Sequence, residues 1–419
     1  MFGSRRCLII LTFFALTMLV FPSVSNANEE GLVSEISVPV GQSLQEAINS
    51  AVEGDTILIQ NGVHVEGKYP VFVNKSVTLM GQDVEQTIVD GNSSMTGIFI
   101  VSVDDVRIIN LTVQNTTSNY GISGIHVAHV RNVEISGCTV AYCGSGIQLT
   151  DSTDGNITKN RIADNLGNGI YLHSSSSYNR IFGNNITDNP IGVLISDMFS
   201  QLNLFHYNNF VNNTSQLSAI GALNYWNATY PAGGNYWDDH ANLDLMNGVD
   251  QNVVGSDGIA DSSYQDLDWY PLTKPIYFYS MGQWSGQDYC ATIASNSTIS
   301  GFRFDPSAGS FVSFDVAGED FTVGCCRVAV PKNVLWVDSL QQWAVMANGT
   351  ALVPNSLIVE DAENTYFYFS YDHSIQSIRI VGTHVVPELL LLAILALLTL
   401  FVGLFVLLGK LEVSSVAAG

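Results

Sequence analysis

The sequence predicts an all-β chain in which a β-solenoid is followed by a β-sandwich, and three observations lead to that prediction. A repeat of 22 to 23 residues runs through the first half, alternating strands and turn residues fill the next module, and each end carries an apolar run. Because 419 residues exceed one ordinary core, two or three domains are expected.

The repeat is read from two series. Gly-aliphatic-x-aliphatic recurs at Gly124, Gly146, Gly169 and Gly192, with spacings of 22, 23 and 23, and Ile-x-x-Asn-x-Ile recurs beside it. The strands are too short, and alternate too regularly, for helix. One such unit cannot bury its apolar face alone, so coils must stack, at the usual strand spacing of about 4.8 Å.

Asparagine recurs in this repeat although it is poor in strands. It tolerates the left-handed backbone of tight bends, and stacked amides can satisfy one another where an unpaired one costs about 1–3 kcal/mol. We predict two inward ladders, formed by Asn160, Asn184 and Asn208 and by Asn165, Asn189 and Asn213. Cys138 and Cys143 occupy the same columns one coil earlier and are interpreted as interior filler.

Composition restricts the partners. Fifteen Lys and Arg stand against 38 Asp and Glu, a net charge of −23. This negative charge excludes nucleic acid as a partner, because nucleic-acid binding needs a cationic surface. It also disfavours polyanionic sugars as ligands unless a cation bridges them to the protein.

The two ends predict export and anchoring. Arg5 and Arg6, an apolar run and a small-residue site at Ala27 predict a signal peptide over residues 1–27. Residues 389–408 are uncharged and long enough to span a bilayer. We therefore expect a transmembrane helix over 385–409, a cytoplasmic tail over 410–419, and an ectodomain at the cell surface.

The expected ectodomain is rich in Asn-x-Ser/Thr sequons, which fit an exported glycoprotein, and the expected sites are Asn110, Asn156 and Asn185. Five cysteines remain after the signal peptide, without a zinc spacing. A disulfide from Cys290 to Cys325 or Cys326 and free thiols both fit.

Three further motifs follow the repeat in order: GGNYWDDH at 233–240, GSDGIADSSY at 255–264 and DWYPLTKP at 268–275. With the opening segment from Ile36, which includes GDTI at 54–57, the set resembles the NosD-like, or CASH-type, right-handed parallel β-helix family. The resemblance implies a β-helix over 28–230, capped by a short helix at 44–51, and a C-terminal cap over 231–275. Tyr236 and Trp237 are expected to seal the rod end.

Residues 276–384 lack the asparagine columns. About seven alternating strands in roughly 100 residues predict a β-sandwich. Its ending is similar to the membrane-proximal module of archaeal cell-surface proteins, with Val386 and Pro387 before the apolar run.

Three groups of residues are candidates for a functional site. Asp164 and Asp188 lie one coil apart, as paired carboxylates of a hydrolase would, but Asp-Asn is also turn chemistry, so no catalytic residue is predicted. An outward column of His126, Gln148 and Tyr171 could stack on a sugar. The acidic loop with Asp250, Asn252, Asp257 and Asp261 is the candidate for Ca²⁺.

Copper, which NosD-like proteins help to deliver, needs clustered His, Met or Cys ligands. The eight histidines are scattered, and His126 and His129 are the only near pair, so copper is not expected. The leading prediction is a membrane-anchored surface protein that binds glycans, or another cell-envelope component, or has a structural role, without catalysis. A polysaccharide lyase or hydrolase is the alternative, and a copper-maturation accessory protein is the second.

Overall fold

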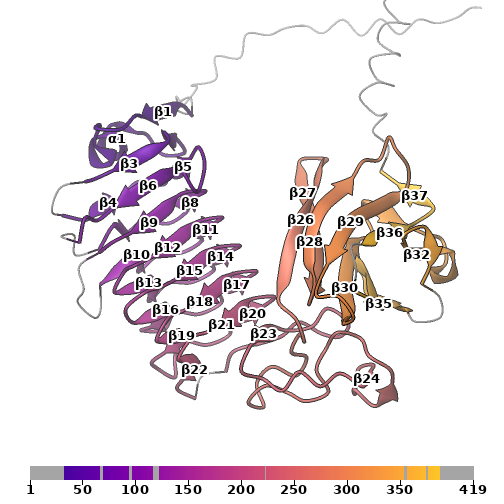
Figure 1. Cartoon of the computed structure of the whole chain (residues 1–419). Coiled ribbons are helices and arrows are strands. Elements are labelled where there is room, and N and C mark those ends of the chain that lie inside the picture. Colours follow the sequence, from indigo (N-terminus) through magenta and orange to yellow (C-terminus); the bar gives the residue numbers. More distant parts are fainter. Residues whose placement is uncertain are drawn as a thin grey trace, which may run out of the picture.

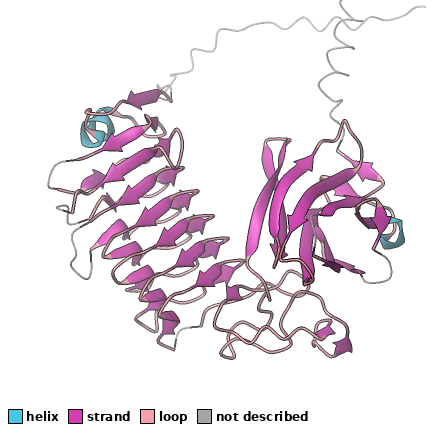
Figure 2. Ribbon diagram, in the orientation of Figure 1, coloured by secondary structure: helices cyan, strands magenta, loops and turns pink. Residues whose placement is uncertain are grey.

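A computed structural model describes residues 33–66, 69–93, 97–116, 122–221, 223–352, 356–373 and 376–386. The chain forms a right-handed parallel β-helix, a loop-rich cap and a β-sandwich (Figures 1 and 2). Each coil of the rod gives one strand to each of three parallel sheets. The predicted all-β fold is therefore confirmed.

The three sheets of the rod run along its whole length. The first contains β1 (Glu35–Val38), β2 (Thr56–Ile59), β5 (Thr78–Gly81), β8 (Arg107–Ile109), β11 (Glu134–Ser136), β14 (Asn156–Thr158), β17 (Arg180–Phe182) and β20 (Leu204–His206). The second contains β4 (Val71–Val73), β7 (Phe99–Val101), β10 (Ser123–Ala128), β13 (Ser145–Thr150), β16 (Asn168–His173), β19 (Ile191–Ile195) and β22 (Ser215–Ala219). The third contains β3 (Gly62–His64), β6 (Thr87–Asp90), β9 (Thr112–Gln114), β12 (Thr139–Ala141), β15 (Arg161–Ala163), β18 (Asn185–Thr187), β21 (Asn209–Val211) and β23 (Tyr236–Trp237).

Aliphatic side chains stack in register inside the rod. Ile135, Ile157, Ile181 and Phe205, for example, are paired along the first sheet and fully or almost fully buried. The helix α1 (Leu44–Ser50) closes the N-terminal end. Its Ser43 side chain accepts the Glu46 N–H as an N-cap, and its apolar face is buried against the first coils.

The cap continues the rod by one rung. Strand β23 pairs in parallel with β21, so Tyr236 and Trp237 belong to the third sheet rather than to a separate plug. Trp237 is fully buried between Phe210 and Tyr264, whose rings stack on it at 4.2 and 4.1 Å. The predicted sealing of the rod end is thus present. Further along the cap, a short hairpin pairs β24 (Met246–Asn247) with β25 (Val253–Val254).

Two five-stranded antiparallel sheets form the sandwich, more strands than the seven expected. One contains β26 (Ile276–Trp284), β27 (Gln287–Ser295), β30 (Val323–Pro331), β35 (Asn364–Asp372) and β34 (Ser356–Glu360). The other contains β28 (Thr298–Phe304), β29 (Phe311–Ala317), β36 (Gln376–Val381), β32 (Ala344–Ala347) and β33 (Thr350–Ala351). A short pair, β31 (Leu335–Trp336) and β37 (His384–Val385), and the 3₁₀ turn η1 (Leu340–Gln342) complete it.

The sandwich is fixed to the rod and cap. Arg327 on β30 is buried and donates to the carbonyls of Pro231 and Asp257 in the cap. Phe278 on β26 packs against Phe182 and leaves no room for a side chain at Gly183, where a Cβ would lie 2.7 Å from its ring. In Figure 1 the long hairpin β26–β27 accordingly lies beside the last coils of the rod.

Several predictions fall outside the described residues: the signal peptide, the membrane span from residue 387 onward and the cytoplasmic tail. No helix within the described ranges is both long and apolar enough to cross a bilayer. Five cysteines lie in the described part and all are unpaired, so neither Cys325 nor Cys326 is bonded to Cys290. Burial raises the pKa of the Cys138 and Cys143 thiols to about 12 and about 11, which suits inert filler.

Candidate functional site

The second sheet carries a polar strip on its outer face. Register places His126 on β10 beside Gln148 on β13, and Gln148 beside Tyr171 on β16. Two residues further along, Thr150 is paired with His173. We call these five residues the polar strip; they alternate with inward aliphatic residues because successive side chains of a strand point to opposite faces.

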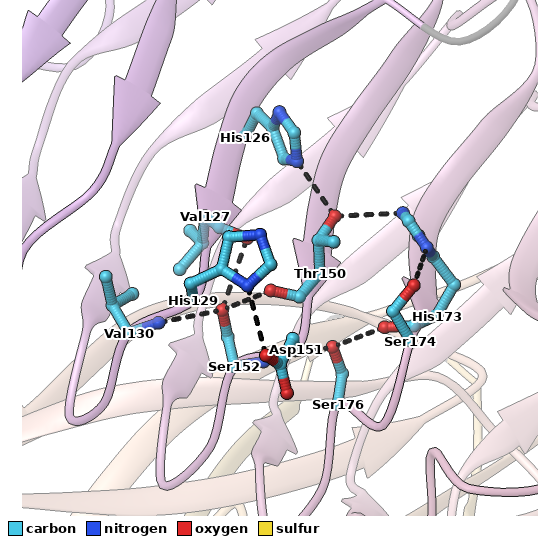
Figure 3. Close-up of polar contacts among 10 residues, drawn as sticks. All are labelled: His126, Val127, His129, Val130, Thr150, Asp151, Ser152, His173, Ser174 and Ser176. Carbon is cyan, nitrogen blue, oxygen red and sulfur yellow. Dashed lines mark hydrogen bonds and ion pairs between the residues drawn. The ribbon is translucent and has the colours of Figure 1, made fainter.

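Hydrogen bonds connect the strip across three coils. Thr150 Oγ1 lies 2.8 Å from His126 Nε2 and 2.9 Å from His173 Nε2, as Figure 3 shows. Gln148 Nε2, which can only donate, lies 2.8 Å from the same His173 nitrogen. His173 Nε2 must therefore accept, which places its proton on Nδ1, toward the Ser174 hydroxyl at 2.8 Å.

Both imidazoles of the strip favour the neutral form. Burial lowers the pKa of His126, and the neighbouring His173 and His129 lower it further. Burial also lowers the pKa of His173, although the Asp197 carboxylate acts in the opposite direction. At neutral pH the strip is thus uncharged, and Tyr171 stacks on His173 with ring centroids 4.6 Å apart.

A histidine and an aspartate border the strip at the following turn. His129 Nδ1 lies 3.0 Å from Asp151 Oδ2, and both residues are exposed and have left-handed backbones with φ of +60° and +46°. His129 and Asp151 thus occupy neighbouring positions on successive coils. Asp197, the third member, accepts hydrogen bonds from its own turn at Phe199 and Ser200.

The strip does not form a hydrolytic triad. Thr150 has a histidine on each side, but the second nitrogen of His173 faces a serine hydroxyl, whereas a triad orients its base with a carboxylate. Asp164 and Asp188 sit in turns with φ of +56° each, and Asp164 faces Arg161 at 3.3 Å. Both residues therefore have the backbone geometry of turn residues, and a catalytic role for them is untested.

The two predicted asparagine ladders are present and buried. In the first, Asn160, Asn184 and Asn208 each donate from Nδ2 to Oδ1 of the next rung at 2.9–3.0 Å. In the second, Asn165 and Asn189 donate to the following rung at 3.0 Å. Cys138 and Cys143 begin these ladders by donating their backbone N–H groups to Asn160 and Asn165.

A third ladder was not predicted. Asn179 donates to Asn203, which donates to Asn224 at 2.9 Å. The signal was available, since Asn179 and Asn203 are separated by the same 24 residues as Asn184 and Asn208. The first ladder also extends into the cap, through Asn235 to the buried Asp268.

The four residues proposed for calcium are spread over the cap. Asp257 is fully buried and accepts from the Ile259 N–H and Gln251, and Asp261 accepts the N–H groups of Leu245 and Met246. Asp250 and Asn252 are exposed. The described ranges contain no group of three or more His, Cys, Asp or Glu arranged to hold a metal. Calcium binding here stays a prediction.

The predicted glycosylation sites differ in their surroundings. The Asn110 side chain donates to the Gly81 carbonyl, and Asn185 accepts from Asn209 at 2.6 Å near the junction with the sandwich. Asn156 and Asn185 flank inward isoleucines and point outward, as expected. Glycosylation at the three sites stays a prediction.

The rod matches one known protein family. Residues 40–242 match the family model described as periplasmic copper-binding protein (NosD). No curated protein matches the chain.

Solved structures that are partly similar to this chain have low identities and low TM-scores. A pectin methylesterase from Yersinia enterocolitica is 14% identical over 48% of this chain and 76% of its own, with a TM-score of 0.30. The PL6 family alginate lyase AlyGC is 13% identical over 42% of this chain and 31% of its own, at 0.28. The tailspike of Acinetobacter baumannii phage AM24 is 10% identical over 85% and 77%, at 0.24. These likenesses concern the fold alone.

Proposed function

We propose, from the premise that the rod is a β-helix of the NosD family, that this chain is an exported surface protein that binds neutral glycans along the polar strip without transforming them. One observation carries the proposal. His126, Thr150, Tyr171 and His173, which are partly exposed, form with the buried Gln148 an uncharged, hydrogen-bonded group across three consecutive coils.

The chemistry of the strip suits carbohydrate. Imidazole, amide and hydroxyl groups both donate and accept, as sugar hydroxyls do, and the Tyr171 ring offers a face for stacking. Mutual hydrogen bonds fix these side chains before a ligand arrives, which reduces the entropy lost on binding. The net charge of −23 favours neutral glycans over uronates.

Export and anchoring are part of the proposal. The signal-peptide pattern at residues 1–27 and the uncharged run at 389–408 support it, as does the periplasmic description of the matching family. In this arrangement the ectodomain meets glycans or other envelope components outside the membrane.

An enzyme on the same fold is the competing function. It would need an acid and a base placed about a scissile bond, whereas Asp164 and Asp188 occupy turns. Copper delivery is the second alternative; His126 and His173 both approach Thr150, and among the described residues no third side chain completes a metal-binding group with them.

A glycan array probed with the purified chain tests the proposal, paired with a product assay on the same sugars. Binding of neutral glycans that leaves them chemically unchanged is expected. Bond cleavage or a new double bond, lost in Asp164→Asn or Asp188→Asn, would establish the enzyme instead.

A further inference from the structure

The cap contains a cleft separate from the polar strip. Its volume is about 400 Å³, and its lining includes Asp250, Gln251, Asp261, Trp269 and Tyr270. That volume lies in the range of ordinary small-ligand sites.

The aromatic lining of this cap cleft comes from two consecutive residues whose backbone is held by hydrogen bonds. Trp269 is 60% exposed, yet its backbone N–H is held by Asn227 Oδ1 at 3.0 Å. The next residue, Tyr270, donates its N–H to Asp268 and its hydroxyl to the Val249 carbonyl at 3.0 Å. Much of the Trp269 side chain is thus exposed to solvent at the cleft, and this exposure contributes nothing to the core.

The polar part of the cleft lining provides carboxylate oxygens that can accept further hydrogen bonds. Asp250 is exposed, and its carboxylate accepts no hydrogen bond from the described residues. Asp261 is held by the N–H groups of Leu245 and Met246, which leave it lone pairs to spare. No Lys or Arg lies among the described residues that line the cleft.

We infer that the cap cleft binds a protonated amino sugar. The apolar face of the pyranose ring would stack on Trp269, while its ammonium would donate to Asp250 and Asp261 and approach the aromatic face as a cation–π partner. A uronate would be repelled by the same carboxylates. This inference rests on the proposed function, since it adds a second glycan site of different charge preference.

The test uses two oligosaccharides that differ only in acetylation. The purified full chain is titrated at mildly acidic pH and low salt with the tetrasaccharide of glucosamine and with that of N-acetylglucosamine. The free-amine sugar should bind about tenfold more tightly, because only it carries the charge, and added salt should reduce the difference. Equal affinities would overturn the inference.

Variants assign the site. Trp269→Ala should weaken binding of the glucosamine sugar about tenfold, and Asp250→Asn several-fold, while Asp320→Asn, an equal charge change on the exposed sandwich surface, should leave it unchanged. Trp269→Phe, which keeps an aromatic face, separates loss of the site from loss of folding. Affinity unchanged in Asp250→Asn, or calcium binding there without any affinity for the amino sugar, would reject the inference.

Tyr171→Ala, measured in the same series, distinguishes the two proposals. Neutral glycans that require Tyr171, with no binding of the glucosamine sugar, would reject the cap site and leave the proposed function intact. Amino-sugar binding that requires Trp269, with no neutral-glycan binding, would do the reverse.

Discussion

Asn235 donates its backbone N–H to Asp268 Oδ2 at 2.8 Å and its side-chain amide to the same oxygen at 3.3 Å. Each asparagine of the first ladder donates to the next, so the last rung needs a group that only accepts, and a carboxylate is such a group. Gly234 makes room for it, since a Cβ there would lie 2.0 Å from Asp268 Oδ1. The GGNYW and DWYP motifs therefore form one closing unit.

Asp268→Asn should destabilise the chain by about 1–3 kcal/mol, because both carboxylate oxygens accept hydrogen bonds from N–H groups. In either orientation, the new amide NH₂ group would point a donor at another donor. Chemical denaturation measures the change. Asp266→Asn, two residues away and exposed, is the control and should have little effect. Equal stability of Asp268→Asn and the unmodified chain would mean that the ladder needs no acceptor at its end.

Asn184→Ala should lower the free energy of unfolding by about 1–3 kcal/mol for each buried polar group that loses its hydrogen-bond partner. Asn160 loses its acceptor, and Asn208 loses a donor. Asn156→Ala is the matched control, because that side chain points out of the same rod. Thermal unfolding compares the two. If both variants lose the same stability, the ladder amides contribute nothing specific.

Arg327→Ala should loosen the sandwich from the cap. The change removes two charge-assisted hydrogen bonds, to the Pro231 and Asp257 carbonyls, and an effect of about 3 kcal/mol is expected. Limited proteolysis near residue 276 should become faster. Arg379→Ala, on the exposed face of the sandwich above Phe311, should leave the cleavage rate unchanged, and a similar increase there would argue against a specific junction.

The cap should become more stable as the pH falls from about 7 toward 5. Burial, together with the charges of Asp257 and Asp261, raises the pKa of Asp244 to about 7, from an ordinary value of 3.8. The folded state therefore binds a proton that the unfolded state releases, and the free energy of unfolding decreases as the pH rises through this window. Burial also raises the pKa of Asp268 to about 7, so this residue contributes to the same slope. Unfolding measured at several pH values should therefore show a smaller but remaining slope for Asp244→Asn, and an unchanged slope would contradict the contribution of Asp244.

Most of the rod could be predicted from the sequence because its repeat is regular. The position of Ile157 carries an inward apolar residue in each successive coil, and Asn184 needs an amide in the coil before and in the coil after it. The spacing of these residues therefore indicates the columns without further information. The order of motifs then indicated the cap. The sandwich was less predictable, because β26 and β27 pair in one sheet whereas β28 crosses to the other, and no local pattern specifies that crossing. The contact of Phe278 on β26 with Phe182 and Gly183 joins segments almost 100 residues apart, which a local pattern does not specify either.

The candidate site was predictable only in outline. The column of His126, Gln148 and Tyr171 follows from the repeat, but Thr150 and His173 join it through hydrogen bonds between coils, which sequence spacing does not specify. Asp268 was missed for a similar reason: it lies 33 residues beyond Asn235, in a loop without a repeat. Asp250 and Asp261 line one cleft, but Asp257, from the same acidic loop, points elsewhere.

The central claim is that the polar strip binds neutral glycans, and an isothermal titration of the best array ligand into the Tyr171→Ala chain tests it most directly. Stacking on a ring contributes about 0.5–1.5 kcal/mol, so the affinity should fall about two- to twelvefold. Tyr142→Ala, a change of an exposed tyrosine in a turn outside the strip, should leave it unaltered. Equal affinity of the Tyr171→Ala chain and the unmodified chain would contradict the account.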